Sequence, residues 1–178
     1  MADLFSGNIA PFGCSYFTSY AGIHSIGAAT GSLAASSGAA YPTANKAIFI
    51  PFRLLKPTRI TKLWVLNGAI VSGNLDLGIY TSDGTCIASA GSTAQAGASV
   101  IQIITLGTAI RLPCGLFYMA IAVDNITATV FRTGVDAYLL KVLGMAQMAS
   151  AFPLPVTVTF AAVASSYIPT IGFISEEG

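Results

Sequence analysis

The sequence has little charge and few of the residues that most often carry catalysis. Its 178 residues include 8 Lys and Arg and 7 Asp and Glu, with one His, three Cys and one Trp. Charged residues make 8% of the chain, against about 25% in ordinary soluble domains. A formal net charge of +1 leaves no basic surplus for a nucleic-acid-binding surface. We therefore expect no nucleic-acid partner and no charge-rich disordered region.

The missing charge is concentrated in three stretches. No Asp, Glu, Lys or Arg occurs in residues 4–45, 84–110 or 142–175, which together make more than half of the chain. The mean hydropathy is +0.73. Because an exposed surface ordinarily needs charge for solubility, a monomer of this composition should tend to associate. A membrane or a protein assembly would remove such surfaces from water.

Long hydrophobic runs are also absent. A membrane-spanning helix needs about 20 predominantly apolar residues, whereas the densest run covers only residues 116–123 and is followed by Asp124. The first residues, Met1-Ala2-Asp3, are acidic rather than basic, and no apolar core follows them. The pattern predicts neither a membrane span nor a secretory signal, so we favour a protein assembly.

Cysteine and histidine are too few and too scattered to predict a metal site. Cys14, Cys86 and Cys114 contain no C-x-x-C pair and have no His nearby. We interpret them as small buried hydrophobic residues of a chain made in a reducing cytosol. His24, the single histidine, lies among small residues without a nearby carboxylate. We expect it to have a structural or interfacial role.

The acidic residues offer two site hypotheses, both weaker than a role in turns. Glycoside hydrolysis requires two carboxylates a few ångströms apart, and calcium is bound by oxygen ligands from loops. Asp is, however, common in turns for backbone reasons. The sequence also contains no G-x-S-x-G elbow and no phosphate-binding glycine motif. We expect no enzyme, no catalytic residue, no cofactor and no metal. The carboxylates from which a catalytic pair could come are Asp76, Asp83, Asp124 and Asp136, and the calcium candidates are Asn74, Asp76, Asp83, Asp124 and Asn125.

Residues 1–45 differ in composition from the rest of the chain. More than half of them are Ala, Gly, Ser or Thr, with scattered aromatic residues. A helix through residues 23–40 is the alternative, but the glycines at positions 22, 27, 31 and 38 disfavour it, because each costs about 1 kcal/mol in a helix interior. We predict an extended N-terminal arm over residues 1–45, docked on a neighbouring subunit, and a β-sandwich domain over residues 46–178.

The pattern after Lys46 is typical of β-strands. In residues 74–80, Leu75, Leu77 and Ile79 alternate with polar or small residues, which predicts a half-buried strand. In the preceding candidate strand, residues 59–66, alternation places Ile60 and Trp64 on one face. Strands are expected at residues 47–52, 59–66, 74–80, 85–89, 100–106, 116–123, 126–131, 156–160 and 169–174.

Short strands separated by turn signals every 8–12 residues predict an all-β antiparallel β-sandwich, jelly-roll-like, with at most one short helix. That helix would lie within residues 135–149. Asp136 is suited to cap it, whereas Gly144 interrupts it, so a short helix and an irregular segment both remain open.

Four aromatic residues suggest a carbohydrate-binding platform as an alternative to core packing. The shared face of Trp64 and Ile60 favours a core position for the tryptophan. The four residues are Trp64, Tyr80, Phe117 and Tyr118.

Three segments carry a resemblance to a known group of proteins. They are residues 44–52 (ANKAIFIPF), residues 71–84 (VSGNLDLGIYTSDG) and residues 112–120 (LPCGLFYMA), and a Pro-Leu-Pro stretch follows at residues 153–155. Together they span roughly residues 44–174, and they resemble small β-sandwich structural proteins of tailed bacteriophage virions, of the head-decoration or tail and fibre type.

The resemblance implies a non-enzymatic structural subunit of a phage particle. Its partners would be further copies of itself, in a trimer or a higher homo-oligomer, and a neighbouring capsid or tail protein. It would be located in the virion and assembled in the host bacterial cytoplasm. The hairpin motif also occurs in carbohydrate-binding sandwiches, so a receptor- or glycan-binding module of a phage fibre is the alternative.

Overall fold

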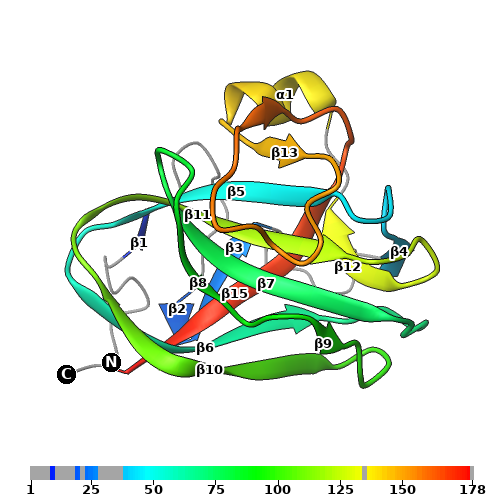
Figure 1. The fold of residues 1–178 in the computed structure, drawn as a ribbon, viewed down its shortest axis with the longest axis horizontal. Coiled ribbons are helices and arrows are strands. Elements are labelled where there is room, and N and C mark those ends of the chain that lie inside the picture. Colours follow the sequence, from blue (N-terminus) through cyan, green and yellow to red (C-terminus); the bar gives the residue numbers. More distant parts are fainter. Residues whose placement is uncertain (1–8, 11–18, 21–22, 28–37, 134–135, 177–178) are drawn as a thin grey trace.

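Alternating apolar residues form two antiparallel sheets that pack against each other, with one short helix at the side (Figure 1). The prediction of an all-β sandwich is therefore confirmed. The computed structural model describes residues 9–10, 19–20, 23–27, 38–133 and 136–176, and it describes side chains from residue 38 onward.

The first sheet has the strand order β14-β13-β5-β11-β7-β8, with β1 added at β5 and β9 at β7. Long antiparallel pairings of β11 with β5 and with β7 form its centre. The strands are β1 (Ile9–Ala10), β5 (Ala47–Leu54), β7 (Asn74–Thr81), β8 (Cys86–Ser89), β9 (Thr93–Ala94), β11 (Gly115–Val123), β13 (Ala146–Met148) and β14 (Ala161–Ala162).

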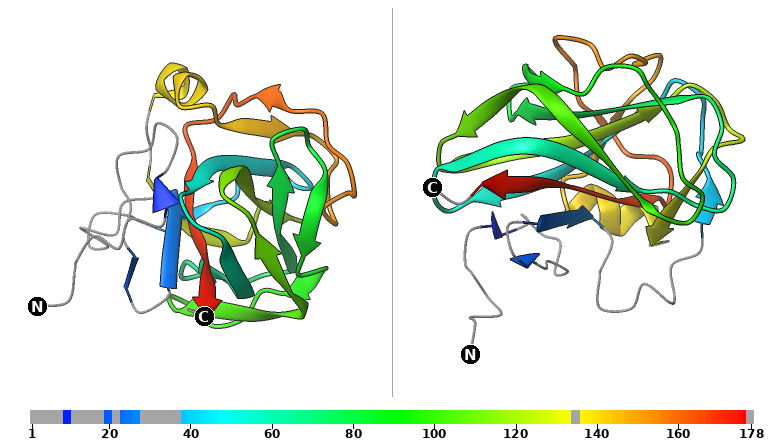
Figure 2. Two further views of the ribbon diagram at one scale, coloured as in Figure 1. Left: turned by 90° about the vertical axis from the view of Figure 1, so that its left-hand side faces the viewer. Right: turned by 90° about the horizontal axis from the view of Figure 1, so that it is seen from below.

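The second sheet has the order β10-β6-β15-β12-β4. From the predicted arm, β3 pairs with β15 and β2 pairs with β3 (Figure 2). The strands are β2 (Ser19–Tyr20), β3 (Ile23–Gly27), β4 (Gly38–Ala40), β6 (Thr58–Leu66), β10 (Ile101–Leu112), β12 (Thr129–Thr133) and β15 (Ile168–Glu176).

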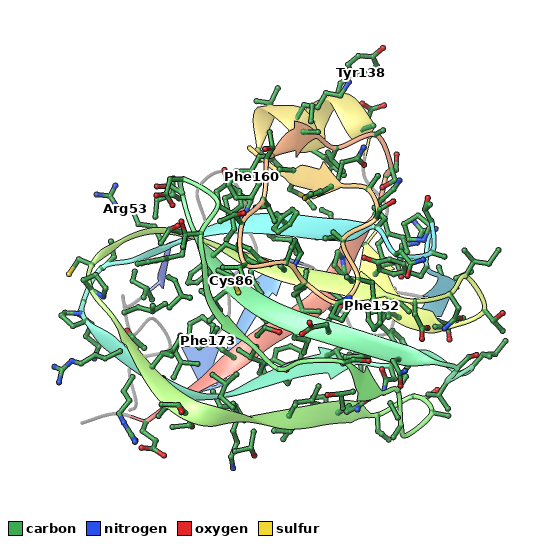
Figure 3. All side chains as sticks on the ribbon, in the orientation of Figure 1. Arg53, Cys86, Tyr138, Phe152, Phe160 and Phe173 are labelled. Atoms are coloured by element: carbon green, nitrogen blue, oxygen red, sulfur yellow. The ribbon has the colours of Figure 1, made fainter. Side chains whose placement is uncertain are left out.

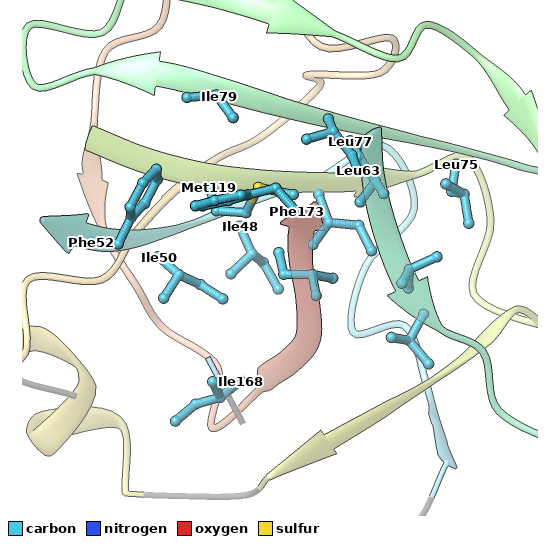
Figure 4. Packing of buried hydrophobic residues seen from close by; sticks show 14 of the residues in the cluster. Ile48, Ile50, Phe52, Leu63, Leu75, Leu77, Ile79, Met119, Ile168 and Phe173 are labelled. Atoms are coloured by element: carbon cyan, nitrogen blue, oxygen red, sulfur yellow. The ribbon is translucent and has the colours of Figure 1, made fainter. Parts of the chain in front are cut away.

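The main core lies between the two sheets. Ile48, Ile50 and Phe52 of β5 project from one side of their strand toward Leu63 and Phe173 of the second sheet (Figure 4). All five side chains are fully buried. Each such aliphatic or aromatic side chain contributes about 1.5–3 kcal/mol when removed from water, so this layer holds the sheets together.

A β-bulge in β6 changes the faces that simple alternation predicts. Lys62 pairs with Ile174 of β15 and Ile60 pairs with the next residue, Ser175, so Thr61 is an extra residue on β6. A bulge shifts alternation by one position. Ile60 therefore joins the main core together with Leu63 and Val65, whereas Trp64 does not. The prediction that Ile60 and Trp64 share a face is wrong for this reason.

Both faces of the first sheet are buried. Leu77 and Ile79 of β7 enter the main core as predicted, but Tyr80 on the opposite face is also fully buried. It lies in a second apolar cluster with Phe49 and with Leu154 from a later segment. We call residues 149–160 the covering segment. The interpretation of β7 as half-buried is therefore wrong, because this later part of the chain covers its second face.

The covering segment lacks the strand predicted at residues 156–160. Only an isolated bridge between Thr157 and Thr85 is formed there. The backbone N–H of Cys86 donates to the Val156 carbonyl at 2.8 Å, and that of Val158 donates to the Gly84 carbonyl at 2.9 Å. Despite its alternating pattern, this segment forms only these few backbone contacts with the β7–β8 hairpin and no regular ladder.

The ambiguous segment contains helix α1 (Ala137–Val142). The Asp136 side chain caps it by accepting a hydrogen bond from the Tyr138 N–H at 2.8 Å. Gly144, with a φ of 77°, follows its end in the left-handed conformation typical of helix C-termini. Asp136 and Gly144 thus mark the two ends of one short helix.

Residues 38–45, which composition groups with the arm, lie in the sandwich. β4 pairs with β12, and Tyr41 is 1% exposed within the main core. The Tyr41 hydroxyl lies 2.9 Å from the Ile121 carbonyl and 2.8 Å from the Lys46 carbonyl. Residues 38–45 therefore belong to the sandwich rather than to a separate arm.

Candidate functional site

The four carboxylates weighed as a catalytic pair occupy four different settings. Asp76 is buried within β7, and Asp83 lies in the exposed β7–β8 turn. Asp124 follows β11, and Asp136 caps α1. Over the residues that the structure describes, no group of three His, Cys, Asp or Glu side chains could hold a metal ion. Each carboxylate instead accepts hydrogen bonds from backbone N–H groups, from a hydroxyl or from a side-chain amide.

Asp76 is the one fully buried carboxylate among them. Its Oδ2 accepts hydrogen bonds from the Ser89 hydroxyl at 2.9 Å and from the Leu154 N–H at 3.0 Å. Burial raises the pKa of this carboxyl above its ordinary value of 3.8, and these hydrogen bonds lower the pKa and partly offset burial. Its partners come from β8 and from the covering segment, so its bonds fasten three pieces of chain together.

Three of the five calcium candidates gather where the start of β7 meets the turn after β11. Asp124 accepts from the Asn74 N–H at 3.0 Å, and the Asn125 amide donates to Asp124 at 2.6 Å and to the Ser72 carbonyl at 2.9 Å. A Cβ at Gly73 would lie 2.2 Å from the Asp124 carboxylate, so glycine is required there. The oxygens satisfy backbone and amide donors, which supports the role in turns.

The aromatic residues do not form a platform. Phe117 belongs to the main core, and Tyr80 to the second cluster, where its hydroxyl donates to the Pro155 carbonyl at 2.6 Å. Tyr118 is half-buried, and its ring lies 4.4 Å from that of Phe160. Trp64 faces away from the main core and is 3% exposed. The structure therefore distributes the four aromatic rings over three environments.

A buried amide network, which sequence patterns did not indicate, holds the loop before β10. The Asn67 amide donates to the Ala96 carbonyl at 2.7 Å and to the Gln102 side chain at 2.9 Å. The Gln95 amide donates to Asn67 at 3.0 Å and to the Thr129 carbonyl at 2.9 Å. Scattered amide residues carry no periodic signal, so only the fold identifies them as partners. The network fixes where β10 begins.

The cysteines differ from one another. Cys86 is half-buried beside Tyr80, and burial raises the pKa of its thiol. Cys114 lies in the β10–β11 turn and is exposed, so the prediction that it is buried is wrong. In this turn the Cys114 thiol donates to the Leu55 carbonyl at 3.3 Å instead of entering the core. Cys14 lies outside the described residues, as does the His24 side chain, although the His24 backbone pairs with Phe173.

Uncharged apolar side chains are exposed along β10 and on α1. Ile101 and Ile103 are 51% and 52% exposed, although both lie in a regular strand. On α1, Tyr138 and Val142 are also exposed, and Tyr138 projects away from the sandwich (Figure 3). Exposed apolar residues at neighbouring positions are typical of surfaces that bind another protein. These surfaces, rather than a catalytic cleft, are the candidate site.

The chain matches no protein-family model, no curated protein and no solved structure. Within the described ranges, no helix has the length and apolar character that crossing a membrane requires.

Proposed function

We propose that this protein is a non-enzymatic structural subunit of a bacteriophage virion, capsid-associated or part of the tail. It assembles through charge-poor surfaces and through its N-terminal arm. The observation that carries the proposal is β10, which exposes Ile101 and Ile103 inside a stretch, residues 84–110, without any charged residue. Burial against another subunit accounts for such a composition, because the centres of protein interfaces are depleted in charge.

The arm supports the same proposal. β3, from the arm, forms five consecutive pairs with β15, from Gly27 opposite Thr170 to Ile23 opposite Ile174. The sequence of the arm can therefore extend the second sheet. Residues 28–37 between β3 and β4 are free of charge and rich in small side chains, which suits a segment that lies against other protein.

The settings of the acidic residues support a non-enzymatic role. General acid and base catalysis needs a group within hydrogen-bonding distance of a reacting atom. Asp76 is instead sealed under the covering segment, and Asp124 is engaged by Asn74 and Asn125. The virion assignment itself rests on the resemblance of residues 44–174 to phage sandwich proteins.

Size-exclusion chromatography with light scattering tests the assembly step. The purified chain should form a discrete oligomer, a trimer or larger, over a range of concentrations. A monomer at every concentration would contradict the proposal. Antibodies against the sandwich should also label the phage particle that carries this chain, and absence of labelling on intact and on partly disassembled particles would contradict a virion role.

A glycan array distinguishes the receptor-binding alternative. Tyr138 is the most exposed of the aromatic residues that the structure describes. A structural subunit should give no specific glycan signal. Specific binding that is lost in Tyr138→Ala, but retained in Val142→Ala on the same helix, would favour the receptor-binding module instead.

A further inference from the structure

β10 is a long edge strand. It runs over Ile101–Leu112 and pairs antiparallel with β6 alone among the described strands. In Figure 1 it follows the lower margin of the sandwich, with β6 beside it. An edge strand presents a row of unpaired backbone N–H and C=O groups, which is a template for another strand.

One hydrogen bond shows which residues of β10 direct their backbone groups outward. The Asn67 N–H donates to the Val100 carbonyl at 3.0 Å, in continuation of the pair between Ile101 and Leu66. In an antiparallel ladder, residues alternate between bonding to one neighbour and pointing away from it. Residues 102 and 104 therefore bond to β6, whereas Ile101, Ile103 and Thr105 direct their N–H and C=O groups to the open edge.

This edge lacks the features that usually prevent pairing. Natural edge strands are protected by Lys, Pro, a bulge or short length. Residues 101–105 (IQIIT) contain no charge and no proline, and their register with β6 is regular. The irregularity begins only after Thr105. Ile101, Ile103 and Thr105 are all exposed on the outer face. The open, regular part of the edge is therefore five residues long and centred on Ile103.

We propose that two copies of this chain pair antiparallel through residues 101–105 of β10, with a two-fold axis at Ile103. This inference rests on the proposed function and specifies one of its self-interfaces. Ile103 lies opposite Ile103 of the second copy, and Ile101 opposite Thr105 of the second copy. Every residue whose backbone groups face the edge then meets another such residue, and the second sheets of the two copies join into one.

Charge favours a second copy as the occupant. In a two-fold contact each residue faces the same segment, so any charge would be repeated on both sides, and like charges directly opposite each other are destabilising. Residues 101–105 carry none. Among the β6 residues that pair with this segment, only Lys62 is charged, and it pairs with Thr105 at one end, so the two lysines of a pair lie at opposite ends. The contact predicts an even-numbered oligomer rather than a trimer, with further contacts made elsewhere on the subunit.

A charge substitution tests the interface. Ile103→Lys places two cations opposite each other at the axis and should raise the dissociation constant by about tenfold or more. In light scattering the variant should have half the mass of the wild-type oligomer or less. Ile126→Lys is the matched control, because Ile126 is 59% exposed and lies between β11 and β12, outside the proposed interface. This variant should keep the wild-type mass.

Cysteine cross-linking tests the register without a destabilising charge. In a background with Cys14, Cys86 and Cys114 changed to Ala, Ile103→Cys should form a disulfide-linked dimer on mild oxidation. Directly opposite Cα atoms in such a pair are about 5.5 Å apart, within the range that a disulfide spans. Ile101→Cys alone should not cross-link, because its two copies would lie about 13 Å apart. A mixture of Ile101→Cys and Thr105→Cys chains should form the cross-link, because these two positions lie opposite each other in the pair.

The outcomes separate this inference from the proposed function. A wild-type oligomer whose mass is unchanged by Ile103→Lys, with no cross-link through Ile103→Cys, would overturn the β10 interface and leave the assembly proposal standing. A monomeric wild type would overturn both. Cross-linking of Ile101→Cys alone would overturn the register, since it requires a different axis.

Discussion

The buried carboxylate of Asp76 in β7 accepts a 3.0 Å hydrogen bond from the backbone N–H of Leu154, 78 residues further along the chain. The Leu154 side chain also packs on Gly78, where an added Cβ would lie 2.8 Å from the Leu154 Cδ1 atom. A carboxylate that alternation placed on a solvated face is therefore the point at which the covering segment is attached to the sheet.

Asp76→Ala should destabilise the fold through this attachment. It leaves the Leu154 N–H unpaired in a buried position, which should lower the free energy of unfolding by about 1–3 kcal/mol. Urea denaturation at neutral pH measures the change. Ser89→Ala is the matched control, because it removes one neutral donor from the same carboxylate and should cost about 0.5–1.5 kcal/mol. Equal losses in the two variants would show that Leu154 does not depend on Asp76.

Acid should stabilise the wild type relative to Asp76→Asn. Burial raises the pKa of Asp76 in the folded protein above the unfolded value of about 3.8. Between those two values the folded state binds the proton more tightly, so stability rises as the pH falls through this window and levels off below it. Urea denaturation of both proteins from pH 7 to pH 4 tests the difference. A wild type that loses stability relative to the variant on acidification would contradict the burial effect.

Alanine variants of two glycines distinguish the cost of a steric contact from the cost of backbone strain. Gly84 has a φ of 90°, and a Cβ there would lie 2.2 Å from the Val158 carbonyl oxygen, whereas Gly91 has a φ of 73° and open space around it. Gly84→Ala should therefore be less stable than Gly91→Ala by about 1–3 kcal/mol, the usual cost of overpacking. It should also speed proteolysis within the covering segment. Similar melting temperatures and cleavage rates would contradict the contact.

Truncation tests where the sandwich begins. A chain starting at Gly38 retains β4 and Tyr41 and should unfold cooperatively. A chain starting at Lys46 loses both, and loss of a large buried aromatic side chain alone costs about 3–5 kcal/mol. Thermal unfolding followed by circular dichroism compares the two chains. If they melt alike, residues 38–45 contribute nothing to the fold. Tyr41→Phe, which removes only the hydroxyl, should cost about 0.5–1.5 kcal/mol.

The alternating pattern is sufficient to predict the sandwich and the inner face of β7. Leu75, Leu77 and Ile79 do line the main core. Alternation reports only which residues are apolar, and it carries no information on what covers the opposite face. Tyr80 therefore looked solvent-facing, although the covering segment packs on it. Contacts between distant segments of this kind depend on the complete chain.

Local irregularities account for the remaining differences. The extra residue Thr61 reverses the faces of β6 after Ile60, and a bulge has no clear signature in sequence. Composition places Tyr41 in the arm because its neighbours are small, yet its ring is buried in the main core. Asp124 lies in a turn, as the adjacent sequence predicts, and Asp136 caps α1, which is one of the two possibilities that the sequence left open for that segment.

The covering segment makes the first sheet a middle layer, and this has a consequence for sequence variation. Side chains of β5, β7 and β11 meet protein on both faces, and the small residues Ala47, Ala120 and Ala122 lie under the segment. A substitution in these strands must fit two sets of neighbours at once. The outer positions of β10 have neighbours on fewer sides in the single chain. In a library of random variants selected only for folding, β5, β7 and β11 should therefore stay nearly unchanged, whereas Ile101 and Ile103 should vary. Selection for assembly should instead retain apolar residues at Ile101 and Ile103.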